Sequence, residues 1–576
     1  MKSRSALITV AGLVSTAAAG QEKLLPLPPM GFSAWTAYGL GARDQNFRDI
    51  ADTWSKNGLH AAGYNRINLD DGWQQLRRAD NNSLVPNSRN FPYGFRALTD
   101  YLTNKGFKPG IYTAAGMHTC GANPIPERSY PGSLGYEDID YKDFENWGFE
   151  YIKLDACHMP EVRGPDNWPA GVPTPVHNES VYREVYGKWA GILAKSRKPM
   201  VLSNSAPASF YPEVCTNLAD WYTVMGWVQK FSGLARHGVD TDGSWGNVMR
   251  SYSFNNRLAR YQKVGFYNDP DFLHAGSQTP DERKSQFALW CSFSAPLIIG
   301  DAFGERLNEY NYLINKDLIA INQDKLVQQA TLVSNDGTWD VLTKSLDGGD
   351  RVLTILNKGA SAGNINVSWE RIGLSSKALR TSKKFSVKDL WTGKSLQVVF
   401  KDGHIGSTNT FAVGVGGITA RGVPSHGTAV FRIGKSDSPV TPTGLIFTTA
   451  GKTEQGTAYG SHEEQKCLTD NESGNVTFAT CDGSDAQTWR VRPDGRINSL
   501  LRPNECIVDA WGKILSLQSG CQSDTWRYDI SGNLINGKSK NCLTKKDYGA
   551  ATAAKCGNEL NSQVVALPIG VTVVGQ

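Results

Sequence analysis

Short apolar runs alternate with longer mixed segments from about Pro28 to Asp301. The longer segments have helix-like patterns, as at Phe47–His60 and Val181–Lys195. The apolar runs predict buried strands, and they include Arg66–Leu69, Pro109–Thr113, Tyr151–Leu154, Pro199–Ser203 and Pro296–Gly300. Strand and helix repeated in this way predict a parallel sheet, and the length of the region suits a (β/α)8 barrel.

One of these runs, Phe149–Cys157, carries charged residues near its end. Side chains alternate along a strand, so Lys153 and Asp155 share one face. Burying this pair is costly unless the two residues have a task, although structural ion pairs also occur inside barrels. A second strand end carries carboxylates again, Asp70 and Asp71. This repetition favours a functional site at the carboxyl ends of the strands, the rim that carries the chemistry in such barrels.

The pattern changes after about Asp324. Short alternating strands with Asp-Gly and Gly-Gly turns predict an antiparallel β-sandwich, and Gly434–Thr443 has the Pro/Ser/Thr composition of a linker. A chain of 576 residues is too long for a single core. We therefore expect a multidomain protein with a signal peptide at 1–20, the barrel at 21–323, the sandwich at 324–434, the linker at 435–444 and a last domain at 445–576.

The last domain contains an internal repeat. Its cysteines fall into three pairs of nearly constant spacing, Cys467–Cys481, Cys506–Cys521 and Cys542–Cys556, and a Gln-x-Trp-like group follows each pair. A repeat of about 40 residues with one disulfide and such a group resembles the ricin-B type β-trefoil, a carbohydrate-binding module. The Trp residues of these groups are expected in the core.

The trefoil resemblance implies where sugar would bind. In that family an Asp just after the first Cys of a repeat binds sugar hydroxyls, and a nearby aromatic ring stacks on the sugar. Asp509 with Trp511 fits this pattern, whereas Asp470 has no close aromatic residue. The third repeat has Lys545 at this position and is expected to be silent. A purely structural trefoil is the alternative.

Five motifs in the first part of the chain occur in a specific order: Pro29–Trp35, Leu69–Trp73, Gly110–Tyr112, Tyr151–Cys157 and Tyr267–Leu273. Together they resemble glycoside hydrolase family 27, the α-galactosidase family, from about Pro28 to Ile433. The resemblance implies a barrel followed by an antiparallel β-domain, in agreement with the boundaries above. Three positions depart from the family pattern, namely Phe32, Gly72 and Phe272.

The resemblance makes Asp155 the catalytic nucleophile, and Lys153 on the same strand face would hold it ionised. In Arg236–Trp245 an Arg precedes an Asp by four residues, as in the family segment that carries the acid/base. This match selects Asp240, with Asp242 as the rival. Family members retain the anomeric configuration through a covalent glycosyl-enzyme. The two carboxyls should then lie about 5–5.5 Å apart, whereas about 6.5–9.5 Å would indicate inversion.

The resemblance also implies the substrate contacts. Asp70 and Asp71 would accept hydrogen bonds from O4 and O6 of the sugar. The other expected pocket residues are Trp35, Tyr112, Lys153, Ser205, Arg236 and Asp271, while Asp269 is interpreted as a turn residue. Cys120 and Cys157 occupy the places of a family disulfide beside the pocket.

The loop Ser203–Ala208 does not decide which sugar the protein cleaves. α-Galactosidases usually place Cys-Glu-Trp or a similar group there, but Ser205 and Ala208 are small, as in α-N-acetylgalactosaminidases. A β-L-arabinopyranosidase is also open, although Asp70 with Asp71 favours a sugar that has O6. A binding protein without catalysis is a remote alternative. The leading hypothesis is a retaining α-galactosidase that acts on galactose-containing oligosaccharides and plant polysaccharides.

The N-terminus is typical of a secretory signal peptide, with a basic start, an apolar stretch and small residues before Gly20. Ten cysteines fit an extracellular protein. Five glycosylation sequons agree with this and predict a glycoprotein: Asn81, Asn178, Asn366, Asn471 and Asn475. Cys215 and Cys291 are left over; Cys291 is expected to be a buried thiol, and a bridge between the two stays open.

The charge argues against two classes of partner. A net charge of +5 is small at this length, and no basic run stands out, so neither nucleic acid nor a membrane surface is an expected partner. The nine His have no metal-ligand spacing, and no phosphate-binding loop is evident. We therefore expect neither a metal nor a cofactor.

Overall fold

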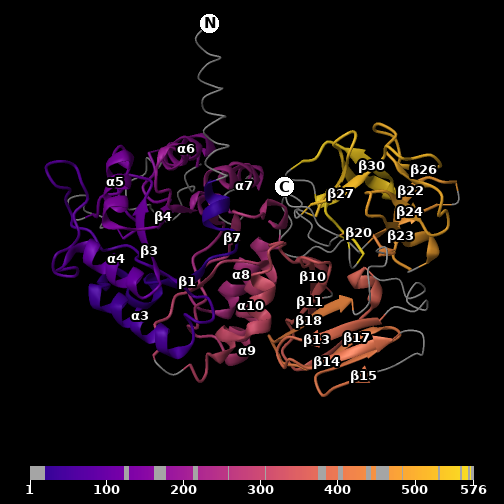
Figure 1. Cartoon of the computed structure of the whole chain (residues 1–576), viewed down its shortest axis with the longest axis horizontal. Helices are drawn as coiled ribbons and strands as arrows, with labels where there is room; N and C mark the ends of the chain where they lie inside the picture. Colours follow the sequence, from indigo (N-terminus) through magenta and orange to yellow (C-terminus); the bar gives the residue numbers. More distant parts are fainter. Residues whose placement is uncertain are drawn as a thin grey trace, which may run out of the picture. The chain divides into compact units, whose positions relative to one another are not determined.

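The computed structural model (Figure 1) describes residues 20–121, 129–160, 177–211, 218–256, 258–304, 307–335, 337–373, 384–399, 406–435, 443–448, 466–471, 473–482, 484–529, 532–557, 561–568 and 571. Most of the predicted signal peptide, most of the predicted linker and Cys215 lie outside these ranges. Within them, no helix combines the length and the apolar character that crossing a membrane requires.

The chain forms two compact units. The first consists of Met1–Asn255, Val264–Gln278 and Ala295–Ile314, and the second of Asn256–Lys263, Thr279–Ser294 and Asn315–Gln576.

The first unit contains a parallel sheet with the strand order β7-β6-β5-β4-β3-β2-β1-β8. Its strands are β1 Met30–Ser33, β2 Arg66–Asn68, β3 Lys108–Ala114, β4 Tyr151–Asp155, β5 Val201–Asn204, β6 Leu234–Arg236, β7 Tyr267–Asp269 and β8 Leu297–Ile299. Just after β7, Leu273 forms backbone hydrogen bonds with Ile298 and Gly300, which join the two ends of the sheet. The predicted barrel is therefore confirmed, and all five predicted strand runs lie on its strands.

Helices alternate with these strands. In the first unit they are α2 Trp35–Tyr38, α3 Asp44–Asn57, α4 Gly94–Asn104, α5 Glu137–Trp147, α6 Glu179–Lys195, α7 Leu218–Phe231 and α8 Trp245–Asn255. The helix α3 shows why the local sequence is helical. Phe47, Ile50, Ala51 and Trp54 recur at helical spacing and are buried, and Gly58 ends the helix in a left-handed conformation with φ 94°.

The second unit begins with α9 Pro280–Phe293 and α10 Lys316–Asn322. An antiparallel sandwich follows, with sheets of order β14-β13-β18-β11-β10-β9 and β12-β17-β16-β15. Its strands are β9 Thr331–Asn335, β10 Trp339–Ser345, β11 Arg351–Asn357, β12 Gly363–Val367, β13 Lys384–Asp389, β14 Ser395–Val399, β15 Gly406–Ser407, β16 Phe411–Gly414, β17 Gly417–Val423 and β18 Thr428–Lys435. The antiparallel pairing confirms the predicted fold of this region.

Three small antiparallel sheets form the last part of the second unit, in the orders β19-β23-β24-β25-β26, β22-β21-β20-β31 and β27-β28-β29-β30. Their strands are β19 Thr443–Leu445, β20 Phe447–Thr448, β21 Lys466–Asp470, β22 Val476–Thr480, β23 Thr488–Val491, β24 Ile497–Ser499, β25 Cys506–Val508, β26 Ser516–Gln518, β27 Trp526–Tyr528, β28 Leu534–Asn536, β29 Cys542–Lys545, β30 Ala551–Ala554 and β31 Val565–Ala566. The three predicted cysteine pairs form disulfides. Trp489 and Trp526 are buried, and each donates its indole N–H to a strand carbonyl, so their predicted core role is confirmed.

The trefoil strands and the sandwich share one hydrophobic core. Leu445, Phe447, Cys467 and Ala566 are buried in the same cluster as sandwich residues such as Phe431. The Leu445 amide also donates to the carbonyl of Gly373. The strand β18 runs to the first residue of the predicted linker 435–444, and β19 starts one residue before its end. The trefoil is therefore packed against the sandwich.

Candidate active site

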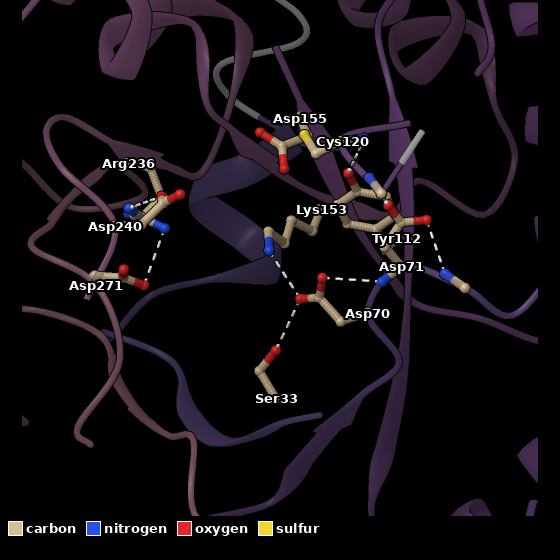
Figure 2. A network of polar contacts seen from close by, with 12 residues as sticks. Ser33, Asp70, Asp71, Tyr112, Cys120, Lys153, Asp155, Arg236, Asp240 and Asp271 are labelled. Atoms are coloured by element: carbon tan, nitrogen blue, oxygen red, sulfur yellow. Dashed lines mark hydrogen bonds and ion pairs between the residues drawn. The ribbon is translucent and has the colours of Figure 1, made fainter. Parts of the chain in front are cut away.

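A cavity of about 470 Å³ opens at the carboxyl ends of the barrel strands. It is lined by Trp35, Asp70, Asp71, Tyr112, Cys120, Lys153, Asp155, Ala156, Cys157, Ala208, Ser209, Tyr211, Arg236, Gly238, Val239, Asp240, Thr241, Asp271 and Phe272. All the predicted catalytic and substrate-binding residues except Ser205 therefore meet in one place. Figure 2 shows the polar part of this site, with Asp155 above the Lys153 side chain and Asp240 to its left.

Lys153 on β4 and Asp70 after β2 form an ion pair at the base of the site. Lys153 Nζ lies 2.8 Å from Asp70 Oδ2, which also accepts a hydrogen bond of 3.2 Å from the Ser33 hydroxyl (Figure 2). Burial opposes the charge of Lys153, but Asp70 and Asp155 outweigh this effect and raise its pKa above the usual value. Lys153 is therefore a fixed cation between two carboxylates.

Asp71 is held by backbone amides. The N–H groups of Gly72 and Gly121 each donate to it over 2.7 Å, one to each carboxylate oxygen. Burial raises the pKa of Asp71 to about 6. A glycine is required at residue 72, where φ is 89° and a Cβ would lie 2.8 Å from the Leu40 Cα; at Gly121 a Cβ would lie 2.9 Å from Asp71 Oδ2. This explains Gly72, which departs from the family pattern.

Asp155 ends β4, and its Oδ1 accepts the amide N–H of Ala156 at 2.9 Å. The disulfide between Cys120 and Cys157, which the family resemblance implies, lies beside it and lines the cavity. Tyr112 is buried, and burial, with the nearby carboxylates, raises its pKa well above the usual value. Tyr112 is therefore a neutral wall of the cavity.

The opposite wall is built around Arg236, the last residue of β6. Its Nη2 lies 2.8 Å from Asp240 Oδ1, and its Nη1 lies 2.9 Å from Asp271 Oδ1 (Figure 2). Burial opposes the charge of Arg236, but Asp271 and Asp240 outweigh it and raise its pKa. Arg236 thus stays protonated and fixes two carboxylates at the cavity.

The two acids that Arg236 holds differ in environment. The Asp240 side chain is 94% exposed, and the positive charge of Arg236 lowers its pKa. Asp271 is buried, and burial raises its pKa. Its backbone has a φ of 81°, and its Oδ2 accepts the amide N–H of Thr241 at 2.7 Å. Asp242, the rival of Asp240, is exposed, caps the amide of Ser244 and is absent from the cavity lining.

The loop after β5 differs from the expectation. Ser205 is buried, its amide N–H donates to the Leu154 carbonyl, and it is not among the residues that line the cavity. The short helical turn Ala206–Ser209 follows it and places Ala208 and Ser209 at the cavity instead. Asp269, left out of the predicted site, is also buried away from the cavity and accepts the amide of Asp271.

The sequence did not reveal the hydrogen-bond donors that hold the carboxylates of the cavity. The amides of Gly121 and Thr241 hold Asp71 and Asp271, and the Ser33 hydroxyl holds Asp70. Only Gly121 leaves a signal in the sequence, a glycine directly after a disulfide cysteine. Among the described residues, the one group with metal-ligand proximity is Cys120, Asp155 and Cys157, and its sulfurs are bonded to each other and offer no thiolate.

The predicted sugar sites of the trefoil differ from each other. Asp470 is buried, and its Oδ2 accepts the hydroxyl of Ser499 at 2.6 Å. Asp509 is also buried; its Oδ1 accepts the Trp511 amide at 2.9 Å, whereas its Oδ2 has no hydrogen-bond partner among the described residues. Trp511 is 66% exposed, and Lys538 Nζ lies 5.9 Å from its ring centroid.

Comparisons with known proteins agree with this architecture. Residues 40–324 match the family model described as Alpha galactosidase A. Residues 336–433 match the Alpha galactosidase C-terminal beta sandwich domain, and residues 455–564 match the Ricin-type beta-trefoil lectin domain. Each part of the chain thus matches the family that its motifs resemble.

Relatives match over most of their length. The chain is 39% identical to Alpha-galactosidase A of Aspergillus niger over 96% of this chain and 93% of that protein, and 41% identical to Probable alpha-galactosidase A of Aspergillus terreus over 100% of both. The solved structure of an alpha-galactosidase from Saccharomyces cerevisiae is similar with a TM-score of 0.56 and 25% identity, over 71% of this chain and 98% of that one. The chain therefore belongs to the α-galactosidase family, glycoside hydrolase family 27, and carries a ricin-type lectin domain.

Proposed function

We propose that this protein is a secreted, retaining α-galactosidase that removes terminal α-D-galactose from galacto-oligosaccharides and plant polysaccharides. The observation that carries the proposal is the pair Asp155 and Asp240, which line one cavity at the barrel rim, each close to a fixed cation. Four disulfides among the described residues support secretion, because such bonds persist in oxidising compartments.

The proposed reaction is a double displacement. An Asp155 oxygen bonds to the anomeric carbon while the bond from that carbon to the leaving oxygen breaks, and Asp240 gives its proton to the leaving oxygen. Asp240 then takes a proton from water, whose oxygen attacks the anomeric carbon and breaks its ester bond to Asp155. Lys153 places positive charge beside Asp155 throughout. The exposed carboxyl of Asp240 is accessible to both the leaving group and water.

Galactose is selected in this proposal by Asp70 and Asp71. The two carboxylates are held rigidly by Lys153 and by backbone amides, yet neither uses all of its acceptor sites on the protein contacts described. An axial O4 and the O6 hydroxyl can donate to the sites that remain. Ala208 lines the cavity with a small side chain, which leaves room for a larger sugar substituent. The 2-acetamido sugar is therefore the most important alternative substrate to test.

A substrate panel tests the proposal. We expect the protein to hydrolyse nitrophenyl α-galactoside faster than the α-N-acetylgalactosaminide, and with a kcat/KM at least about 10² times that for the β-L-arabinopyranoside. Loss of the CH2OH group leaves a buried carboxylate without its donor, and such unpaired groups produce large discrimination. The measurement is initial rates on the three substrates, with NMR of the first-formed anomer. Preference for either competitor, or no turnover of any, would contradict the proposed activity.

We further propose that the second trefoil repeat binds galactose-containing polysaccharide. Asp509 accepts the Trp511 amide, its Oδ2 has no hydrogen-bond partner among the described residues, and the Trp511 ring is exposed. A sugar that stacks on this ring can therefore donate a hydroxyl to the carboxylate. This pairing of an unused acceptor with an exposed aromatic ring supports the site.

Asp509→Ala is expected to weaken retention on insoluble galactomannan about tenfold, because one charge-assisted hydrogen bond contributes about 1.5 kcal/mol or more. Hydrolysis of nitrophenyl α-galactoside should be unchanged. Asp494→Ala is the matched control, since this exposed trefoil carboxylate pairs with Arg496. Equal retention of both variants would show that the site was misassigned.

A further inference from the structure

A small cavity lies within the second unit where sandwich strands meet the end of the trefoil. Its volume of about 10 Å³ is close to that of one water-sized group. It is lined by Ala259, Gln328, Gln329, Thr331, Thr343, Lys344, Ser345, Arg351, Tyr528, Gly532, Val564, Val565 and Ala566. Its lining thus includes two cationic side chains and no carboxylate.

Arg351, the first residue of β11, is only 2% exposed. Its Nη2 donates to the Leu567 carbonyl and, over 3.4 Å, to the Ser345 hydroxyl. Its Nε has no hydrogen-bond partner within the described part of the chain. A buried guanidinium with an unused N–H group is unfavourable unless something in the cavity accepts its hydrogen bond.

Lys344 adds a second buried cation. Its Nζ donates to the Cys291 carbonyl at 3.3 Å, the Ser294 hydroxyl at 2.8 Å and the Ile321 carbonyl at 2.6 Å, so its three hydrogens are used on neutral acceptors. Burial lowers the pKa of Lys344 to about 7, although Asp324 acts on it in the opposite direction, and burial lowers that of Arg351 to about 10. Neither side chain forms an ion pair with a carboxylate of the described residues, so no carboxylate neutralises the charge of Arg351.

We propose that this cavity binds a chloride ion, held by the free Nε–H group of Arg351. A bound water could accept a hydrogen bond but would leave the charge uncompensated, whereas a halide does both. The Ser345 hydroxyl accepts from Arg351, so its own hydrogen can point to the same ion. A cavity of this size has no room for phosphate, sulfate or a carboxylate ligand. The ion stabilises the junction between sandwich and trefoil.

The test compares halide with a larger anion at constant ionic strength. The intact protein is expected to melt several degrees higher in sodium chloride than in sodium gluconate, with a saturable dependence on chloride, because a ligand of the folded state stabilises it by mass action. Bromide should act in the same way. Crystals soaked in sodium bromide should give an anomalous peak beside Arg351 Nε. Equal melting in chloride and gluconate, or no bromide peak in the cavity, would overturn the proposal.

Two variants locate the effect. Arg351→Gln removes the charge and should abolish the difference between chloride and gluconate. Arg432→Gln is the matched control, because this arginine on the neighbouring strand β18 is partly exposed and pairs with Asp350; its chloride dependence should match the wild type. A chloride effect that persists in Arg351→Gln would overturn the assignment. If that variant does not fold, the melting and bromide measurements on the wild type decide.

Discussion

Asp155→Asn is expected to lower kcat on nitrophenyl α-galactoside by roughly 10⁴-fold or more, the range seen when a catalytic nucleophile is removed. The amide has the size of the carboxylate and can still accept the Ala156 N–H through its oxygen, so the fold should not change. It cannot form the covalent ester with the anomeric carbon. The measurement is steady-state turnover, together with the melting temperature and the affinity for galactose, both of which should stay near the wild-type values.

A chemical rescue experiment tests the same role of Asp155 through the product that it forms. In Asp155→Gly, added azide can occupy the vacated space and attack the anomeric carbon from the side that the carboxylate used, so the expected product is β-galactosyl azide. Asp242→Asn is the control, because Asp242 is exposed and caps Ser244 without lining the cavity. Its turnover should be close to that of the wild type. Substantial hydrolysis by Asp155→Asn would remove this residue from the mechanism.

Asp240→Asn is expected to show a dependence on the leaving group. The loss of a general acid should lower turnover of a galacto-oligosaccharide by about 10²–10⁴-fold, since its leaving oxygen needs a proton. Nitrophenolate leaves without one, so formation of the glycosyl-enzyme from the nitrophenyl substrate should be affected much less. Single-turnover rates on the two substrates measure this difference. Equal losses on both would contradict the role of Asp240 as the acid.

The pH dependence follows from the position of Arg236. Its positive charge lowers the pKa of Asp240, so in the free enzyme the acid form of Asp240 is populated only at low pH. As the pH rises through that lowered pKa, the proton is lost, and kcat/KM for an oligosaccharide should fall. In Arg236→Gln the charge is gone, and the fall should move to higher pH even though overall activity is lower. An unchanged pH profile in this variant would contradict the assignment.

Much of the barrel could be predicted from the sequence because its strands are buried on both faces. Runs such as Tyr151–Leu154 and Pro296–Gly300 are nearly continuous apolar segments and became β4 and β8. The short strands β15 and β16 were not predicted, since two to four residues between glycines leave too little pattern. The trefoil was predicted from the spacing of its cysteine pairs, a signal that does not depend on hydrophobic periodicity.

The site was predictable where a side chain stands at a strand end, as for Asp70, Asp155 and Arg236. The amides that fix Asp71 and Asp271 come from loop backbone, which leaves almost no trace in the residue types. Ser205 is the opposite case, a residue that was expected to contact the substrate but is not among those that line the cavity. It follows β5 directly, where a rim contact was expected, but the helical turn after it directs the cavity contact to Ala208.

The common core of sandwich and trefoil limits how this protein can be re-engineered. Fully burying side chains such as Leu445 and Phe447 contributes roughly 1.5–3 kcal/mol each, and they are buried against the sandwich as well as their own strands. A truncation after β18 would therefore expose buried apolar side chains both on the remaining enzyme and on the excised lectin domain. Transplanting this lectin onto a different hydrolase calls for carrying the sandwich with it as a single cassette.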